Sequence, residues 1–209
     1  MNWTRRRNGK RPPVRIIQVF TEGKVTEPEY LDALKADPAL GHGEEVRITC
    51  PSSHRGMQPL PLVQAAVKYR NEANPAEYDE IWCLFDVEAP RAHPNLLQAV
   101  RLADGNDIRC AVSNPCFELW LLLHHQEHHS HISTQETRRL LTAASGRAGK
   151  GIDTQWYREH RDQAGQRARD LRDEHTRNGT RFPMDNPSSQ MDLFITAVEG
   201  DLTLKPESP

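Results

Sequence analysis

The sequence lacks several features that define large classes of proteins. No apolar run approaches the roughly 20 residues of a membrane-spanning helix, and the arginine-rich N-terminus has no apolar segment behind it. The net charge at pH 7 is only −2, so nucleic-acid binding would depend on local basic patches rather than on the field of the whole chain. We therefore expect a soluble, cytoplasmic protein without membrane contact.

Two kinds of motif are also missing. The four cysteines have no CxxC spacing, which argues against a zinc or disulfide framework and favours buried free thiols. No GxxxxGK[ST] loop occurs, so any control by ATP would need a separate ATPase partner protein.

The hydrophobic content suffices for one substantial core, since 36% of the 209 residues are hydrophobic.

Residues 1–13 are expected to be a flexible basic arm. An α/β domain is predicted over residues 14–130. Beyond it, eleven Arg or Lys against six Asp or Glu lie between Arg138 and Arg181. A basic helical extension is therefore predicted over residues 131–209, with its last helix packing back on the core.

Strands and helices are predicted to alternate along the α/β domain. The predicted strands cover residues 14–20, 46–50, 80–85 and 108–112, and the helices that follow them cover 26–34, 60–70, 93–102 and 114–123. Further helices are predicted over 134–144, 153–175 and 187–198. This order favours a mostly parallel sheet with helices on both faces. In such folds, ligands bind outside the carboxyl ends of the strands.

Acidic residues follow two of these strands. Glu22 comes after the first strand, and Asp86 and Glu88 come after the third. Converging carboxylates repel one another unless a cation or proton neutralises them, and carboxylate oxygens are the ligands that Mg²⁺ prefers. The alternative is that these acids are helix caps or solvated loop residues. Glu27 is either a first-turn helical acid or a group for proton transfer.

Four segments resemble the signature blocks of RloB-like proteins. They are TEGKVTEPEY at residues 21–30, FDVE at 85–88, SNPCFELWLLLH at 113–124 and NPSS at 186–189. The resemblance implies a Toprim-like fold related to the nucleases of overcoming-lysogenization-defect proteins. It also implies an association with phage-defence loci.

The resemblance further implies a site that binds Mg²⁺ or Mn²⁺. It gives catalytic roles to Glu22, Glu27, Asp86 and Glu88, and metal contacts to Glu22, Asp86, Glu88 and Glu118. Ser113 falls where the related nucleases place a further site group. One departure stands out, because Glu88 occupies a position where Toprim proteins usually have Asp. The longer side chain leaves the coordination geometry open.

Several other polar residues have two interpretations each. Lys24, His54, Arg55 and Ser113 are candidate substrate contacts, while Lys24 could instead balance nearby acids and His54 and Arg55 could belong to an exposed loop. The arginine-rich helix over 158–172 is either a nucleic-acid face or a solvated face with i,i+4 ion pairs. The histidines of residues 124–131 form either a zinc site or a solvated tip, with His124 at a helix C-terminus.

The function predicted from these features is metal-dependent cleavage of DNA or RNA in anti-phage defence. The main alternative is a non-catalytic module that binds nucleic acid or an ATPase partner. A weaker alternative is phosphoryl transfer on a small nucleotide, using the same carboxylates.

Overall fold

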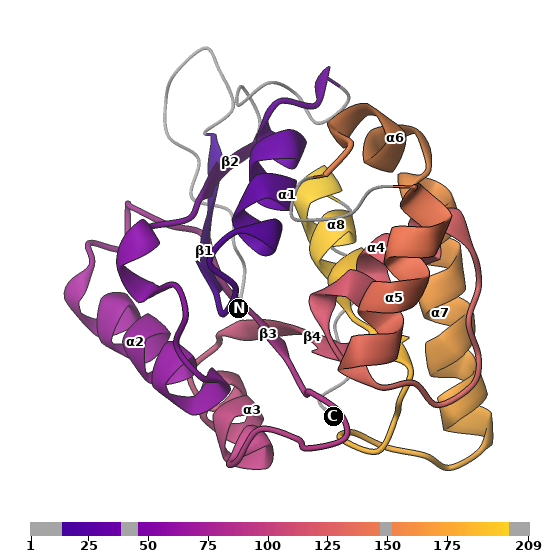
Figure 1. The fold of residues 1–209 in the computed structure, drawn as a ribbon. Helices are drawn as coiled ribbons and strands as arrows, with labels where there is room; N and C mark the ends of the chain where they lie inside the picture. Colours follow the sequence, from indigo (N-terminus) through magenta and orange to yellow (C-terminus); the bar gives the residue numbers. More distant parts are fainter. Residues whose placement is uncertain (1–13, 39–45, 147–151, 201–209) are drawn as a thin grey trace.

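The five-stranded sheet of the protein is mostly parallel. The structure, a computed structural model, describes residues 14–38, 46–146 and 152–200 (Figure 1). The sheet order is β2-β1-β3-β4-β5, from β1 (Arg15–Thr21), β2 (Val46–Thr49), β3 (Glu80–Asp86), β4 (Arg109–Asn114) and β5 (Ser188–Ser189). The first four strands pair in parallel and β5 pairs antiparallel to β4. The predicted α/β fold is therefore confirmed, while the predicted basic arm lies outside the described residues.

Helices cover both faces of this sheet. They are α1 (Thr26–Lys35), α2 (Pro59–Glu72), α3 (Leu96–Asp104), α4 (Phe117–His125), α5 (Thr134–Ser145), α6 (Thr154–Glu159), α7 (Arg161–Arg177) and α8 (Met191–Glu199), with a 3₁₀ turn η2 (Ser52–His54). Figure 1 shows α2 and α3 on one side, with α1, α4 and α8 on the other. Across the described ranges, no helix is both long and apolar enough to cross a membrane.

The side chains of β3 show why two helical layers form. Trp82 and Leu84 join the core beneath α1 and α8, whereas Cys83 and Phe85 join the core beneath α2 and α3. Successive residues of a strand point to opposite faces, and here all four side chains are apolar. A strand of this composition needs cover on both sides, which the helices provide.

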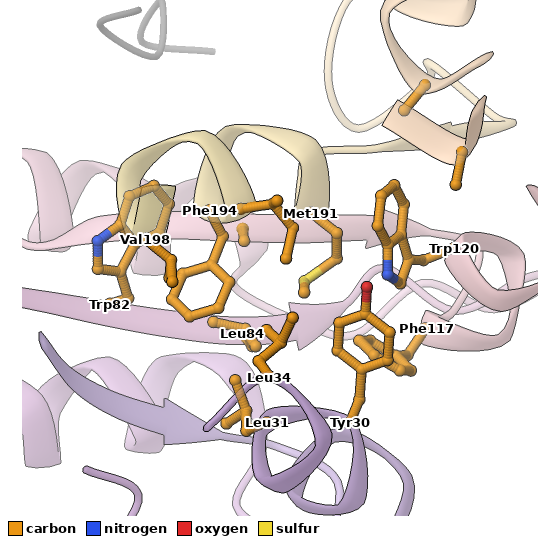
Figure 2. Close-up of a cluster of buried hydrophobic side chains, with 14 of the residues drawn as sticks. Tyr30, Leu31, Leu34, Trp82, Leu84, Phe117, Trp120, Met191, Phe194 and Val198 are labelled. Atoms are coloured by element: carbon orange, nitrogen blue, oxygen red, sulfur yellow. The ribbon is translucent and has the colours of Figure 1, made fainter. Parts of the chain in front are cut away.

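The chain after residue 130 packs on the same sheet. Figure 2 shows Phe194, Met191 and Val198 of α8 lying against the side chains of β3. The rings of Phe194 and Trp82 meet edge to face, with their centroids 5.3 Å apart. Burying such a large side chain contributes about 1.5–3 kcal/mol. This burial holds α8 against the same face of the sheet that α1 covers.

Several local predictions need correction. The segment predicted as one helix over 153–175 is two helices, and the helix predicted from residue 187 begins at Met191, after β5. Strand β4 continues through Asn114, which was expected to open the next helix. The N-cap of α1 is Val25, and no side chain caps this helix. Cys50 lies after β2 and is half-buried rather than buried in a strand.

Candidate active site

The sequence-predicted acids lie at the carboxyl edge of the sheet, as the strand order predicts. Glu22 directly follows β1, and its backbone N–H donates to the carbonyl of Leu84 on β3 at 2.9 Å. Asp86 is the last residue of β3 and is in register with Ser113 of β4. Because the three strands are parallel, these residues meet at one edge of the sheet.

Both carboxylate oxygens of Glu22 face polar groups. Oε2 accepts a hydrogen bond from the backbone N–H of Asp86 at 3.0 Å, and Oε1 lies 2.7 Å from Nε2 of His93. The backbone carbonyl of Glu22 accepts from Gly56 N–H at 2.7 Å, which ties in the loop after β2. The pKa of Glu22 is nonetheless raised, first by burial, although the Asp86 and His93 contacts oppose the shift.

Glu27 bends back from the first turn of α1 toward the same edge. Its Oε1 accepts from the backbone N–H of Gly23 at 2.9 Å. A Cβ at Gly23 would overlap the Glu27 carboxylate, so only glycine leaves room for this contact. Burial raises the pKa of Glu27 to about 7, and the charges of Glu118 and Glu22 add to the rise.

Asp86 is at the centre of the acidic cluster, which we define as Glu22, Glu27, Asp86, Glu88 and Glu118. Burial is the first cause that raises the pKa of Asp86 well above its ordinary value, and each of the four glutamates raises it further. Within the part of the chain that the structure describes, the Asp86 carboxylate accepts no hydrogen bond. A half-buried carboxylate surrounded by four others is destabilised by like-charge repulsion unless a cation or a proton neutralises it.

Glu88 is held in a backbone conformation that few non-glycine residues adopt. Its φ is 70°, and its N–H donates to the carbonyl of Pro115 at 2.8 Å. A left-handed conformation of this kind costs roughly 1–3 kcal/mol and is concentrated at functional sites. The Glu88 carboxylate accepts from Oγ1 of Thr134, the first residue of α5, at 2.7 Å.

Glu118 approaches the cluster from the first turn of α4. It is half-buried, and its Oε1 accepts a hydrogen bond from Nε of Arg138 on α5 at 3.1 Å. Thr134 and Arg138 are four residues apart and therefore lie on one face of α5. Helix α5 thus supplies a partner to two of the five acids.

The cluster is not a closed metal site in this conformation. Among residues 14–38, 46–146 and 152–200, no three His, Cys, Asp or Glu side chains are arranged to hold a metal ion. In this arrangement Glu27, Glu88 and Glu118 each accept a hydrogen bond from a protein group. The donor chemistry still fits Mg²⁺ or Mn²⁺, since the cluster offers carboxylate oxygens around an Asp86 that has no partner of its own.

The four candidate substrate contacts lie at different depths. Lys24 is exposed, and its Nζ comes close to Gly56. The His54 ring packs against Phe20 at 5.2 Å, and Nη2 of Arg55 donates to the Cys50 carbonyl at 3.4 Å. Ser113 is buried. Of these four residues, Lys24 has the most exposed side chain at this edge.

Three contacts of the acids come from residues that the sequence analysis did not single out. They are His93, Thr134 and Arg138. The i,i+4 spacing of Thr134 and Arg138 is a signal that could have placed both on one helix face. The helix predicted to begin at residue 93 begins at Leu96, so His93 lies in the preceding loop, where no periodicity points to it.

The histidine-rich segment is not a solvated tip throughout. His124 is 1% exposed, and its Nδ1 lies 2.9 Å from the Trp120 carbonyl, so Nδ1 carries the proton that is donated. Tyr30 and Tyr157 pack edge-on against its ring. Exposed His129 instead contacts Glu174.

The arginines of α7 are largely used inside the protein. Arg161 pairs with Asp37, Arg167 donates to the Leu123 carbonyl, and Arg172 binds Asp192 through two hydrogen bonds. These contacts join α7 to the segment after α1, to α4 and to α8. They reduce the number of arginines that α7 can offer to another molecule.

Comparisons with known proteins place the chain in one family. No curated protein and no solved structure matches it. The family model described as RloB-like protein matches residues 17–198, which include the whole acidic cluster and all five strands except the first two residues of β1. The chain therefore belongs to the RloB-like family.

Proposed function

We propose that this protein is a metal-dependent nuclease that hydrolyses phosphodiester bonds of DNA or RNA in anti-phage defence. The observation that carries the proposal is the environment of Asp86, a carboxylate without a partner in the described structure and with four glutamates around it. Clusters of this kind, with strongly shifted pKa values, are concentrated at functional sites. The resemblance of the motifs to Toprim-type nucleases supports the same reaction and the defence role.

Asp86 and Glu22 would hold Mg²⁺ or Mn²⁺, with Glu88 and Glu118 joining them on release from Thr134 and Arg138. The bound cation would supply charge stabilisation and an acidified water. Glu27, with its pKa of about 7, is suited to accept a proton near neutral pH. Gly23 N–H holds Oε1 of Glu27, so the proton would go to Oε2.

The proposed substrate is a nucleic acid whose backbone phosphates reach the carboxyl edge. Exposed Lys24 supplies a positive charge beside the acidic cluster, and Lys is a common phosphate contact. Helix α7 contributes less, because three of its arginines face the protein. A separate ATPase remains the proposed source of any ATP-driven control.

The test uses the full chain with supercoiled DNA, single-stranded DNA, transfer RNA and total RNA, each with Mg²⁺, Mn²⁺ or a chelator. We expect cleavage with metal, and a loss of at least about 100-fold in Asp86→Ala and Glu22→Ala, the scale of losing several kcal/mol of transition-state stabilisation. Glu72→Ala, at an exposed acid of α2, is the matched control. Cleavage that persists in both cluster variants would overturn the proposal.

A second function is favoured by a different observation. Glu27, Glu88 and Glu118 already bond protein groups, and no ready-made metal set occurs in the described ranges. This satisfied state suits a non-catalytic module that binds nucleic acid or an ATPase partner. Such a module would bind nucleic acid equally well with and without chelator, and would cleave none of the four substrates.

A further inference from the structure

We propose that His93 is a positioning residue that holds the Glu22 carboxylate in its metal-binding orientation. This inference rests on the proposed function. It concerns a residue outside the acidic cluster and outside the motifs that mark the family in this chain. Three features of the structure carry it: the two-sided grip on Glu22, the anchoring of His93, and the lack of another partner for its Nε2.

The two carboxylate oxygens of Glu22 are contacted by different groups. Nε2 of His93 lies 2.7 Å from Oε1, while the backbone N–H of Asp86 donates to Oε2 at 3.0 Å. The side chains of Glu22 and His93 are 17% and 18% exposed, so water reaches this pair only in part. A glutamate has three side-chain torsions, and contacts to both of its oxygens fix the plane of the carboxylate.

His93 is anchored to the loop that carries the other acids. Its backbone N–H donates to the carbonyl of Val87 at 2.9 Å, and the N–H of Val87 donates to the carbonyl of Ser113 at the same distance. Val87 lies between Asp86 and Glu88. The imidazole is therefore positioned by the same backbone that positions both of these carboxylates, and it joins β1 to β3 through Glu22.

Nε2 of His93 has no other evident task. It is buried and has no hydrogen-bond partner in the described ranges, and its 2.7 Å approach to Oε1 of Glu22 is a close charge contact rather than a formed hydrogen bond. A residue that contacts a metal-binding side chain, rather than the metal itself, orients that side chain. Loss of such a residue typically weakens metal binding 10- to 100-fold. Each carboxylate oxygen of Glu22 keeps a second lone pair, so contact with His93 leaves the group able to bind a cation.

The experiment measures Mn²⁺ affinity of the full chain by calorimetry and by electron paramagnetic resonance, without substrate. We expect His93→Ala to bind Mn²⁺ roughly 10- to 100-fold more weakly than the parent. His93→Gln should recover most of the affinity, because its amide N–H can reach the same carboxylate oxygen. His131→Ala, at an exposed histidine, is the matched control and should bind like the parent.

The possible outcomes separate this inference from the proposed function. A parent protein that binds no Mn²⁺ overturns the proposed function, and the role of His93 with it. A parent that binds Mn²⁺ with an affinity that His93→Ala retains overturns only the role of His93. Nitrogen hyperfine coupling to bound Mn²⁺ that disappears in both His93 variants would make His93 a direct ligand, which also contradicts the positioning role. Circular dichroism of each variant checks that the fold is intact.

Discussion

Buried charges are arranged in opposite ways in two regions of this protein. Between α7 and α8, Arg172 binds the buried carboxylate of Asp192 through two hydrogen bonds of 2.5 and 2.6 Å. At the carboxyl edge of the sheet, Asp86 is surrounded by Glu22, Glu27, Glu88 and Glu118, and all five groups are acids. One region pairs its charges, and the other concentrates charges of a single sign.

The difference separates charges that support the fold from charges kept for a ligand. A paired carboxylate recovers part of its desolvation cost from its partner, and removal of that partner is strongly destabilising. A cluster of like charges destabilises the fold, and proteins retain such clusters where function requires them. If this distinction is correct, the same substitution should have opposite effects on stability in the two regions.

The largest effect is expected for Asp192→Ala. This change leaves the guanidinium of Arg172 partly buried without its carboxylate, and we expect a loss of about 3 kcal/mol in the free energy of unfolding. Urea denaturation in the presence of chelator measures it. Asp170→Ala, on an exposed part of α7, should leave the midpoint unchanged. An unchanged midpoint for Asp192→Ala would contradict the claim that the pair of Arg172 and Asp192 supports the fold.

A smaller loss of stability is expected on acidification, because of His124, which belongs to neither of the two regions. Burial lowers the pKa of His124 to about 3, and the positive charges of His125, His160 and Arg161 contribute. The unfolded chain takes up a proton near pH 6.5 that the folded chain refuses down to about pH 3. Stability from this group is complete above pH 6.5 and is lost as the pH falls through that window, by about 1.4 kcal/mol at pH 5.5.

Unfolding midpoints of the parent and of His124→Leu between pH 7.5 and 5 measure this loss. We expect the parent to lose more stability on acidification than the variant, since leucine removes the titrating ring and keeps an apolar side chain. His131→Ala should follow the parent. Parallel curves for the parent and His124→Leu would show that His124 accepts a proton while folded.

Asp86→Asn is expected to stabilise the protein by about 1 kcal/mol when measured with chelator, because it removes the central charge of the acidic cluster. Thermal unfolding measures the change. Asp192→Asn is the matched substitution in the paired region and should lower the unfolding temperature. Two shifts of the same sign would contradict the distinction between the regions.

Much of the fold follows from patterns that the sequence displays openly. The apolar run of β3 is continuous because both of its faces are covered, and shorter apolar stretches mark β1 and β4. These strands and the helices between them determine which edge carries Glu22 and Asp86. Because the carboxyl ends of parallel strands lie at one edge of the sheet, the sequence predicts where these acids lie but not which groups they contact.

The features that were missed depend on contacts between distant segments. Strand β5 has only two residues, Ser188 and Ser189, which is too short for a period of two to appear. The apparent helix over 153–175 divides at His160, where the composition does not change. His124 ends an apolar run, and its burial results from Tyr30 and Tyr157, which lie far away along the chain.

The partners of the acids were missed for the same reason. His93 reaches Glu22 because its own loop folds back through a bond to Val87. Arg138 reaches Glu118 because α5 packs beside α4. Neither contact is encoded in a local pattern, so the sequence predicts which acids gather but not which groups hold them.

The smallest effect is expected for Arg138→Gln, which removes a positive charge beside the acidic cluster. The Arg138 side chain is 55% exposed, so its pair with Glu118 contributes little to stability. Its loss should tighten Mn²⁺ binding by about two- to five-fold, the equivalent of an exposed ion pair. Arg139→Gln breaks the neighbouring pair with Glu136, which bonds none of the clustered acids, and should leave Mn²⁺ affinity unchanged. Weaker binding in Arg138→Gln alone would mean that Arg138 orients Glu118 rather than competing with the cation for it.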